Sequence, residues 1–240
     1  MFQTIKNAWK IPDLRKKILF TLLMLVIFRF GSFIPVPFLS ADAISAFMSN
    51  MGEDSLLNLM NMFSGGAFSQ ATIFAMSITP YINASIIMQL LSVAFPFLER
   101  IAKEGEEGRK KIAKYTRYCT VILGLIQGTA YYFFLKGSGL VQAKGTFEFI
   151  FTGVVIVLCF TAGSAIMMWL GERIDEKGVG NGISILLFAG ILSRAKSAAA
   201  ILYNFWQSGD FFAFFATIIV FLAIIVFIVF MTGAERRIPV

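Results

Sequence analysis

The sequence predicts an all-α protein that crosses a membrane several times. Hydrophobic residues make up 58% of its 240 residues and charged residues only 15%, too little polar surface to coat a water-soluble globule. A hydrocarbon core of about 30 Å requires about 20 apolar residues of helix. The stretches that meet this requirement are 18–38, 73–95, 119–135, 147–170 and 211–233, with a weaker sixth at 182–206.

The first stretch, 18–38, is predicted to be a retained helix. It is too long for a cleaved signal peptide, and no small-residue cleavage pattern follows it. Arg29 is the only charge well inside an apolar stretch, which makes it a functional candidate by default. We expect Pro35 to end the helix, so that the guanidinium can snorkel about 9 Å to the outer surface. There we favour a structural role for it, bonding to loop carbonyls.

A polar, acidic connection after this helix leads into a short apolar helix, predicted at 55–63. Nine residues of helix reach about 14 Å, less than half the membrane. Ser55 is a suitable N-cap, and Gly65 and Gly66 are a natural stop. A re-entrant piece buried in protein fits this pattern, because lipid does not tolerate exposed backbone ends. A surface helix lying in the outer interface fits it as well.

Positive charge is concentrated on one side of the predicted membrane. Of the 21 Lys and Arg, five precede the first span, seven lie in 100–117, two lie in 172–182, and two are Arg236 and Arg237. By the positive-inside rule the N-terminus is cytoplasmic, and six crossings return the C-terminus there. The net charge of +7 is therefore explained by topology rather than by nucleic-acid binding. The charged loop 99–118 could also contact lipid headgroups or a cytoplasmic partner.

The stretch 182–206 is irregular. Its apolar part, 183–192, spans about 15 Å of helix before Ser193, Arg194 and Lys196 follow. A short, tilted span whose cations have reached the outer interface would explain this pattern. A helix that lines an aqueous funnel would explain it equally well.

Catalytic and metal-binding groups are scarce. The chain has no His, and its 14 Asp and Glu fall in predicted loops or termini, except Glu148 at the very start of the stretch 147–170, which weighs against a proton relay. The glycine run 178–182 lacks the preceding strand and the Lys and Ser/Thr of a nucleotide-binding loop. We expect no cofactor, no metal and no catalytic residue.

An aliphatic row and two polar residues within the predicted spans indicate contacts between helices. Ile78, Ile82 and Ile86 recur every four residues on one helix face. Asn83 and Gln127 are uncharged polar residues inside predicted spans, and such residues usually bond a neighbouring helix.

Four motifs occur in order: FRFGSFIPVP from Phe28, MFSGGAFSQ from Met62, ITPYINASIIMQLL from Ile78 and GERIDEKGVGNGIS from Gly171. Together they closely resemble the SecY family, the protein-conducting channel for secretion. The resemblance implies ten transmembrane helices in two inverted halves of five.

The resemblance therefore implies a SecY-type half-channel: a five-helix repeat plus the sixth transmembrane helix, with a short re-entrant plug helix. The segments would be a cytoplasmic N-terminus, 1–17; the five-helix half, 18–206; and the sixth helix with the start of the next cytoplasmic loop, 207–240. Within the half lie the plug, 55–66, and the cytoplasmic loops 99–118 and 171–182. We expect the second half beyond Val240.

The resemblance also assigns roles to single residues. A pore ring of aliphatic side chains would contain Ile78, Ile82, Ile183 and Leu187. Such a ring deforms around varied polypeptides and resists ions by dewetting. The plug would contain Ser55, Leu56, Leu59, Met60, Met62, Phe63, Ser64, Gly65 and Gly66.

Two further sets of residues follow from the same resemblance. One wall of a lateral gate toward lipid would contain Asn83, Ile86 and Gln127. Arg236 and Arg237 would form the root of a loop that docks a cytoplasmic partner.

The implied function is that of the central pore-forming subunit of the Sec translocase, not an enzyme, in the bacterial plasma membrane. It would pass unfolded secretory polypeptides and release hydrophobic segments laterally. Implied partners are SecE and SecG, SecA or a ribosome, signal-sequence-bearing polypeptides and membrane lipid, without direct nucleic-acid binding. Two alternatives are a secondary transporter with a polar midplane site and an intramembrane enzyme, which would need a nucleophile and a base in the spans.

Overall fold

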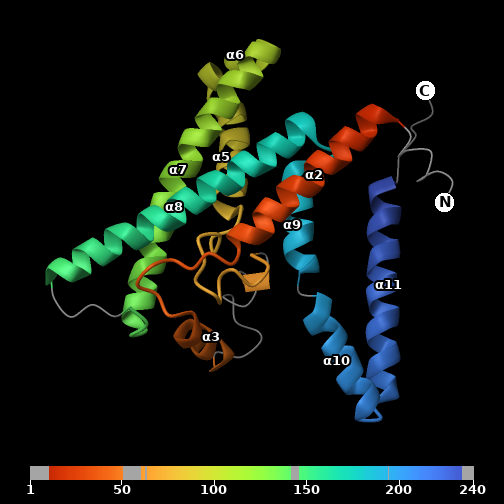
Figure 1. Cartoon of the computed structure of the whole chain (residues 1–240). Coiled ribbons are helices and arrows are strands. Elements are labelled where there is room, and N and C mark those ends of the chain that lie inside the picture. The colour runs from red at the N-terminus through yellow and green to blue at the C-terminus, as the bar shows by residue number, and fades with distance from the viewer. Residues whose placement is uncertain (1–10, 51–60, 63, 142–145, 194, 234–240) are drawn as a thin grey trace, which may run out of the picture. The chain divides into compact units, whose positions relative to one another are not determined.

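The computed structural model describes residues 11–50, 61–62, 64–141, 146–193 and 195–233. The chain divides into two compact units, Met1–Ser193 and Arg194–Val240, and each is described by itself. The helices of the first unit are α2 (Pro12–Gly31), α3 (Ala41–Asn50), α5 (Thr79–Ala94), α6 (Pro96–Lys103), α7 (Glu106–Gly137), α8 (Thr146–Lys177) and α9 (Gly182–Leu192) (Figure 1). The second unit holds α10 (Ala195–Gln207) and α11 (Phe211–Gly233).

Three of the described helices, α7, α8 and α11, are long and apolar enough to cross a membrane. Helices α5 and α6 meet this standard together, but they are bent by 102° at the break between them. The described chain thus holds three to four candidate spans, against six predicted stretches. One reason is that α2 carries Asp13, Arg15, Lys16 and Lys17 in its first turns.

Helix α2 ends at Gly31, earlier than the predicted stop at Pro35. Beyond Gly31 the chain runs beside a distant segment, and the N–H of Val36 donates to the carbonyl of Ala71 at 2.9 Å. The prediction that this helix continues to Pro35 is therefore wrong for its last residues, because pairing with that segment replaces helical hydrogen bonds.

Turns occupy residues 64–78, where the second span was predicted to begin. The backbone is left-handed at Ala71, with φ of 49°, and at Ser77, with φ of 53°. Such values do not continue an α-helix, and α5 begins only at Thr79. The predicted span 73–95 is wrong for its first six residues, which belong to this turn segment.

The charged stretch 99–118 is largely helical rather than a loop. It contains most of α6 and the first turns of α7, separated at Gly105, whose φ is 76°. An ion pair of 2.6 Å between Lys103 and Glu99 links two successive turns of α6. Polar composition indicated exposure here, but an exposed helix has the same composition as a solvated loop.

Helix α8 continues through most of the predicted loop 171–182 and ends at Lys177. Only residues 178–181 separate it from α9. The stretch 182–206, predicted as one weak span, instead forms α9 and α10, with Ser193 and Arg194 between their ends. At 11 residues, α9 is about 16 Å long, too short to cross a membrane alone.

Two hydrophobic clusters hold the first unit together. The Ile78 cluster has as its buried members Met24, Phe28, Ala67, Phe74, Ile78, Met167, Leu170, Ile174 and Leu186. The Tyr131 cluster consists of Val36, Ile44, Met48, Phe68, Ala71, Ala75, Met76, Tyr131, Tyr132, Leu135, Ile156 and Phe160. The turn segment 64–78 contributes side chains to both clusters, so it forms part of the core.

The turn segment also lies directly against α8. A Cβ atom at Gly163 would overlap the carbonyl group of Ile73. On the other side of the segment, the rings of Phe74 and Phe28 stack with centroids 6.1 Å apart. The segment is therefore enclosed between α2 and α8.

Helix α3 was not predicted within the polar connection. Its Ile44 and Met48 lie four residues apart and are only 1% and 5% exposed, both within the Tyr131 cluster.

The second unit differs from the first, since no residue of α11 is buried. The bounds of α11 match the predicted stretch 211–233.

Candidate functional site

The four aliphatic residues predicted to form a ring all lie in or against the Ile78 cluster. Ile78 is a buried member at 1% exposure, and the partly buried Ile82, Ile183 and Leu187 pack against the cluster. Two come from the start of α5 and two from the first half of α9. The fold therefore gathers residues that are far apart in the sequence.

The start of α5 is set by local sequence. The N–H groups of Tyr81 and Ile82 both donate to the carbonyl of Ile78 at 3.1 Å. Pro80 lies in the first turn, where its missing N–H would have no partner within the helix in any case. Ile78 is thus the residue at which the buried turn segment changes into helix.

The connection between α8 and α9 is held by side chains at both of its ends. The N–H of Gly182 donates to Oδ1 of Asp175 at 2.7 Å, and the N–H of Ser184 donates to Oδ1 of Asn181 at 3.0 Å. Asn181 is therefore the N-cap of α9. A Cβ at Gly182 would overlap the Gly171 carbonyl, so the first turn of α9 touches α8.

Helix α2 also binds this connection. The N–H of Val179 donates to Oγ1 of Thr21 at 3.1 Å, while the Thr21 hydroxyl donates to the carbonyl of Lys17 at 2.9 Å. Sequence reasoning did not identify Thr21 or Asp175. The cap at Asn181 was not predicted either, although an Asn immediately before an apolar stretch is a recognisable helix-start signal. A contact between α2 and this connection leaves no local signal in the sequence.

The glycine pair of the predicted plug lies beside the end of α9. Oγ of Ser193 is 3.1 Å from the carbonyl oxygen of Gly65 and 2.7 Å from that of Gly190, within hydrogen-bonding distance of both. Gly65 has a φ of 65°, and a Cβ there would lie 3.0 Å from the Gly190 oxygen. Glycine is therefore required both for this conformation and for this close contact.

Four predicted plug residues, Met62, Ser64, Gly65 and Gly66, lie in the described chain. Ser64 is buried, and its Oγ accepts from the N–H of Phe68 at 3.1 Å. Met62 is 37% exposed. The remaining plug predictions, Ser55, Leu56, Leu59, Met60 and Phe63, fall outside the described residues, as do Arg236 and Arg237.

The residues predicted for a gate wall lie on α5 and α7, which pack side by side (Figure 1). Asn83 and Gln127 are half-buried, and Ile86 is 49% exposed.

Arg29 of α2 is exposed, and its guanidinium lies 4.7 Å from the ring centroid of Phe33. The interaction described for Arg29 is thus with an aromatic face; its bonding to loop carbonyls stays a prediction.

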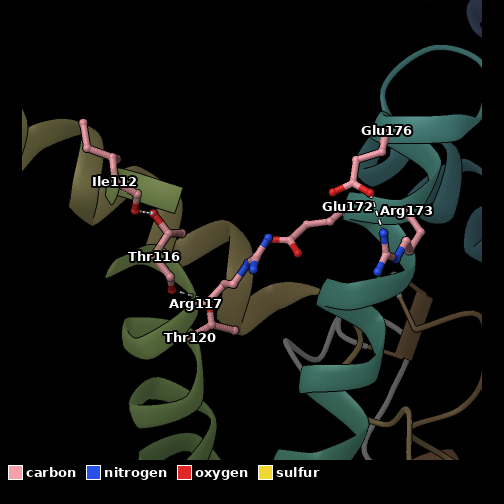
Figure 2. A network of polar contacts seen from close by, with 7 residues as sticks. All are labelled: Ile112, Thr116, Arg117, Thr120, Glu172, Arg173 and Glu176. Carbon is pink, nitrogen blue, oxygen red and sulfur yellow. Dashed lines mark hydrogen bonds and ion pairs between the residues drawn. The ribbon is translucent and has the colours of Figure 1, made fainter. Parts of the chain in front are cut away.

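An ion pair that the sequence did not reveal joins α7 to α8. Nε of Arg117 donates to Oε1 of Glu172 at 2.8 Å (Figure 2). Arg173, the next residue of α8, pairs with Glu176 one turn further along at 2.6 Å. Glu172 is only 17% exposed along its side chain. The pair fixes the charged ends of the two helices to each other, close to the α8–α9 connection.

The described residues contain no group of three or more His, Cys, Asp or Glu able to hold a metal ion. What the arrangement provides is an aliphatic surface, built by the starts of α5 and α9 over a glycine-rich turn segment.

Comparison with known proteins gives one consistent family. A family model described as SecY matches residues 72–240. The protein translocase subunit SecY of Bacillus subtilis is 44% identical over 250 residues, which cover 100% of this chain and 56% of that protein. The subunit of the same name from Thermotoga maritima is 47% identical over 202 residues, covering 82% of this chain and 47% of that protein. The chain thus spans about half the length of these relatives.

Solved structures show a similar fold. A structure described as Sec61 in the canine ribosome-channel complex from the endoplasmic reticulum matches with a TM-score of 0.64 at 18% identity, covering 98% of this chain and 54% of that one. Another, described as the structure of a protein conducting channel, gives the same TM-score and identity over 98% and 53% of the two chains. At this level of identity the likeness concerns the fold alone.

Proposed function

The chain belongs to the SecY family, and from that premise we propose that it forms the N-terminal half of a protein-conducting channel in the bacterial plasma membrane. The complete subunit would pass unfolded secretory polypeptides and release hydrophobic segments sideways into lipid. It would act as a channel and not as an enzyme. In this proposal α2, α5, α7, α8 and the α9–α10 pair are the five helices of the first half, and α11 is the sixth.

The observation that carries the proposal is the meeting of four aliphatic side chains in one cluster. Ile82, Ile183 and Leu187 keep part of their surface exposed, while Ile78 is buried within the cluster. An aliphatic surface makes no hydrogen bonds to a passing chain, so it suits polypeptides of any sequence. A narrow aliphatic ring also excludes ions by dewetting. The other members of the ring would come from the second half.

The plug is proposed to extend over 55–66 and to close the outer side of this ring. Supporting this, the carbonyl of Gly65 meets Ser193 at the end of α9, which ties the last plug residues to a helix that bears two ring residues. A hydrogen bond of this kind contributes about 1 kcal/mol. It is strong enough to favour the closed position and weak enough to be broken when a polypeptide arrives.

The gate wall is proposed to run along α5 and α7. Asn83 and Gln127, half-buried, and the exposed Ile86 would face helices of the second half. Uncharged polar groups in a membrane helix contribute about 0.6 kcal/mol on average when they bond a neighbour. Such contacts can separate and form again, as a gate for signal sequences requires.

We further propose SecE and SecG as partner subunits and SecA or a ribosome as the driving partner. The ribosome in the canine complex supports a ribosome-binding role, which Arg236 and Arg237 would serve on the cytoplasmic side. We also propose that the N-terminus is cytoplasmic, because five cations precede the first span and seven more lie in 100–117 on the same predicted side, and cytoplasmic segments carry an excess of Lys and Arg.

The test is photo-cross-linking from a probe at Ile82 of the full-length subunit, in its complex, to a secretory precursor stalled midway through the membrane. A probe at Ile224 of α11, which is 53% exposed, is the control. We expect a strong adduct at Ile82 and none at Ile224. An engaged precursor that leaves Ile82 unlabelled would remove this residue from the pore.

A further inference from the structure

A groove with a volume of about 400 Å³ runs between α7 and α8 and shares no lining residue with the Ile78 cluster. Polar atoms contribute very little to its surface, and its size falls in the range of ligand-holding clefts, about 300 to 1,000 Å³. Its walls include Leu125, Thr129 and Phe133 of α7 and Ile150, Val154 and Leu158 of α8.

The bottom of the groove is formed where the ring of Tyr132 packs closely against Gly153. The ring of Tyr132 lies over Gly153, and a Cβ on that glycine would be 2.9 Å from the ring. The Tyr132 hydroxyl donates to the carbonyl of Phe149 at 3.0 Å. This bond and the packing of Tyr132 in the Tyr131 cluster fix the ring against Gly153. The Tyr132 side chain therefore does not fill the space between the α7 and α8 walls of the groove.

One end of the groove carries a positive charge. Nζ of Lys136 lies 3.6 Å from the ring centroid of Phe149, which itself lines the groove. From Leu125, at one end of the lining, to Lys136, just beyond Phe133 at the other end, the helix advances about 16 Å, close to one leaflet, half of a hydrocarbon core of about 30 Å. The groove therefore runs from a cation at the end of α7 toward the middle of the membrane.

We propose that this groove binds one acyl chain of a phospholipid whose phosphate lies beside Lys136. An apolar trough one leaflet long with a lysine at its end is complementary to a phospholipid in both shape and charge. Lysine near a helix end reaches the membrane interface with its ammonium while its stem stays on apolar surface. Lys136 is exposed there, so its ammonium is accessible to a headgroup.

The dimensions favour a lipid chain over a further helix. An α-helix with side chains is about 10 to 12 Å across, whereas this groove is the furrow between two helices already in contact. Close packing of membrane helices relies on small residues, and Gly124, Gly128 and Gly153 are already buried between α7 and α8. The exposed rim is aromatic and aliphatic.

The test uses the full-length subunit in its complex, reconstituted into phosphatidylglycerol vesicles that contain a photoactivatable phosphatidylglycerol with a diazirine in one acyl chain. Adducts are mapped by mass spectrometry of peptides. Val154→Trp fills the groove, and Ile122→Trp is the matched control, since Val154 is 53% exposed and Ile122 58% but only Val154 lines the groove. We expect Val154→Trp to abolish the adducts on groove residues and Ile122→Trp to leave them unchanged.

A second variant tests the headgroup. Lys136→Gln is expected to lower the yield of groove adducts about fivefold, the factor for one surface lysine near an anionic headgroup. Lys103→Gln, at a site 75% exposed along the side chain, should not change the yield. Leu158→Trp, at the other end of the groove, repeats the filling test if Val154→Trp fails to fold, as judged by thermal unfolding.

Two outcomes would overturn the proposal. Equal adducts in the filled variants and in Ile122→Trp would show that lipid touches this surface without occupying the groove. Efficient disulfide cross-linking of Val154→Cys to a cysteine in another subunit of the complex would show that a protein helix lies there instead.

Discussion

Asp175 and Gly182 are joined across the α8–α9 connection by a hydrogen bond of 2.7 Å, in which the glycine N–H donates to the carboxylate. The first N–H groups of a helix have no partner within it, and a carboxylate there also meets the positive end of the helix dipole. Together with the contact between Gly182 and Gly171, this bond sets the direction in which α9 leaves α8. The positions of Ile183 and Leu187 depend on it.

Replacing Asp175 by Ala should therefore destabilise the first unit. Loss of a hydrogen bond to a charged group should lower the free energy of unfolding by about 1.5 to 3 kcal/mol. Thermal unfolding of the full-length protein in detergent would measure the change. The control is Glu176→Ala, which removes only a surface ion pair to Arg173 worth about 0 to 1 kcal/mol. Equal loss in both variants would contradict a special role for Asp175.

Gly163→Ala should be strongly destabilising. The added methyl group would overlap the carbonyl of Ile73, and this backbone belongs to the buried turn segment, so it has little room to move. Overpacking of this kind costs about 1 to 3 kcal/mol. Gly137→Ala, where nothing lies within 4 Å of the new methyl group, should leave the melting temperature almost unchanged. A stable Gly163→Ala protein would mean that the turn segment can shift away from α8.

The Arg117–Glu172 ion pair should contribute measurably but modestly. A double-mutant cycle with Arg117→Ala and Glu172→Ala, followed by thermal unfolding, should give a coupling energy of about 0.2 to 1 kcal/mol. The Lys111–Glu104 pair is the comparison, since its side chains are 52% and 45% exposed, against 49% and 17% for Arg117 and Glu172. We expect the weaker coupling in the more exposed pair. The reverse order would show that burial of Glu172 does not strengthen the bond.

In the proposed channel, Ser193→Ala should make the closed state leak ions. Losing the contact with Gly65 removes about 1 kcal/mol from the plug's attachment, which raises the open fraction about fivefold. Conductance of the full-length complex in a planar bilayer, without precursor, would measure this. The control is Ser184→Ala on the first turn of α9, whose side chain is exposed. A tight Ser193→Ala channel would show that the plug is held by other contacts.

The parts of the fold that sequence predicts well are those determined by composition alone. Helix α11 matches its predicted bounds because 20 of its 23 residues are apolar, and the exceptions are only Thr217, Thr232 and Gly233. The four aliphatic residues of α5 and α9 were identified instead through the resemblance to the SecY family, and they meet in one cluster. Their role in a pore stays a prediction.

The parts that sequence misses depend on contacts between distant residues. Residues 73–78 are apolar enough for a helix, yet they turn because they pair with the chain after α2 and lie against Gly163. The ion pair between Arg117 and Glu172 joins positions 55 residues apart. No local period or propensity records either contact, so only the folded chain reveals them.

Helix α8 has 32 residues and is therefore about 48 Å long, whereas a span needs only about 20 residues. The excess at its Lys177 end is continuous helix, tied to α7 by Glu172 and to α9 by Asp175. This end of α8 is therefore rigid and can transmit force to α9. In the proposed channel, a partner that pushed on this end would move α9 together with α8, and the force would reach Ile183 and Leu187 through the hydrogen-bonded connection.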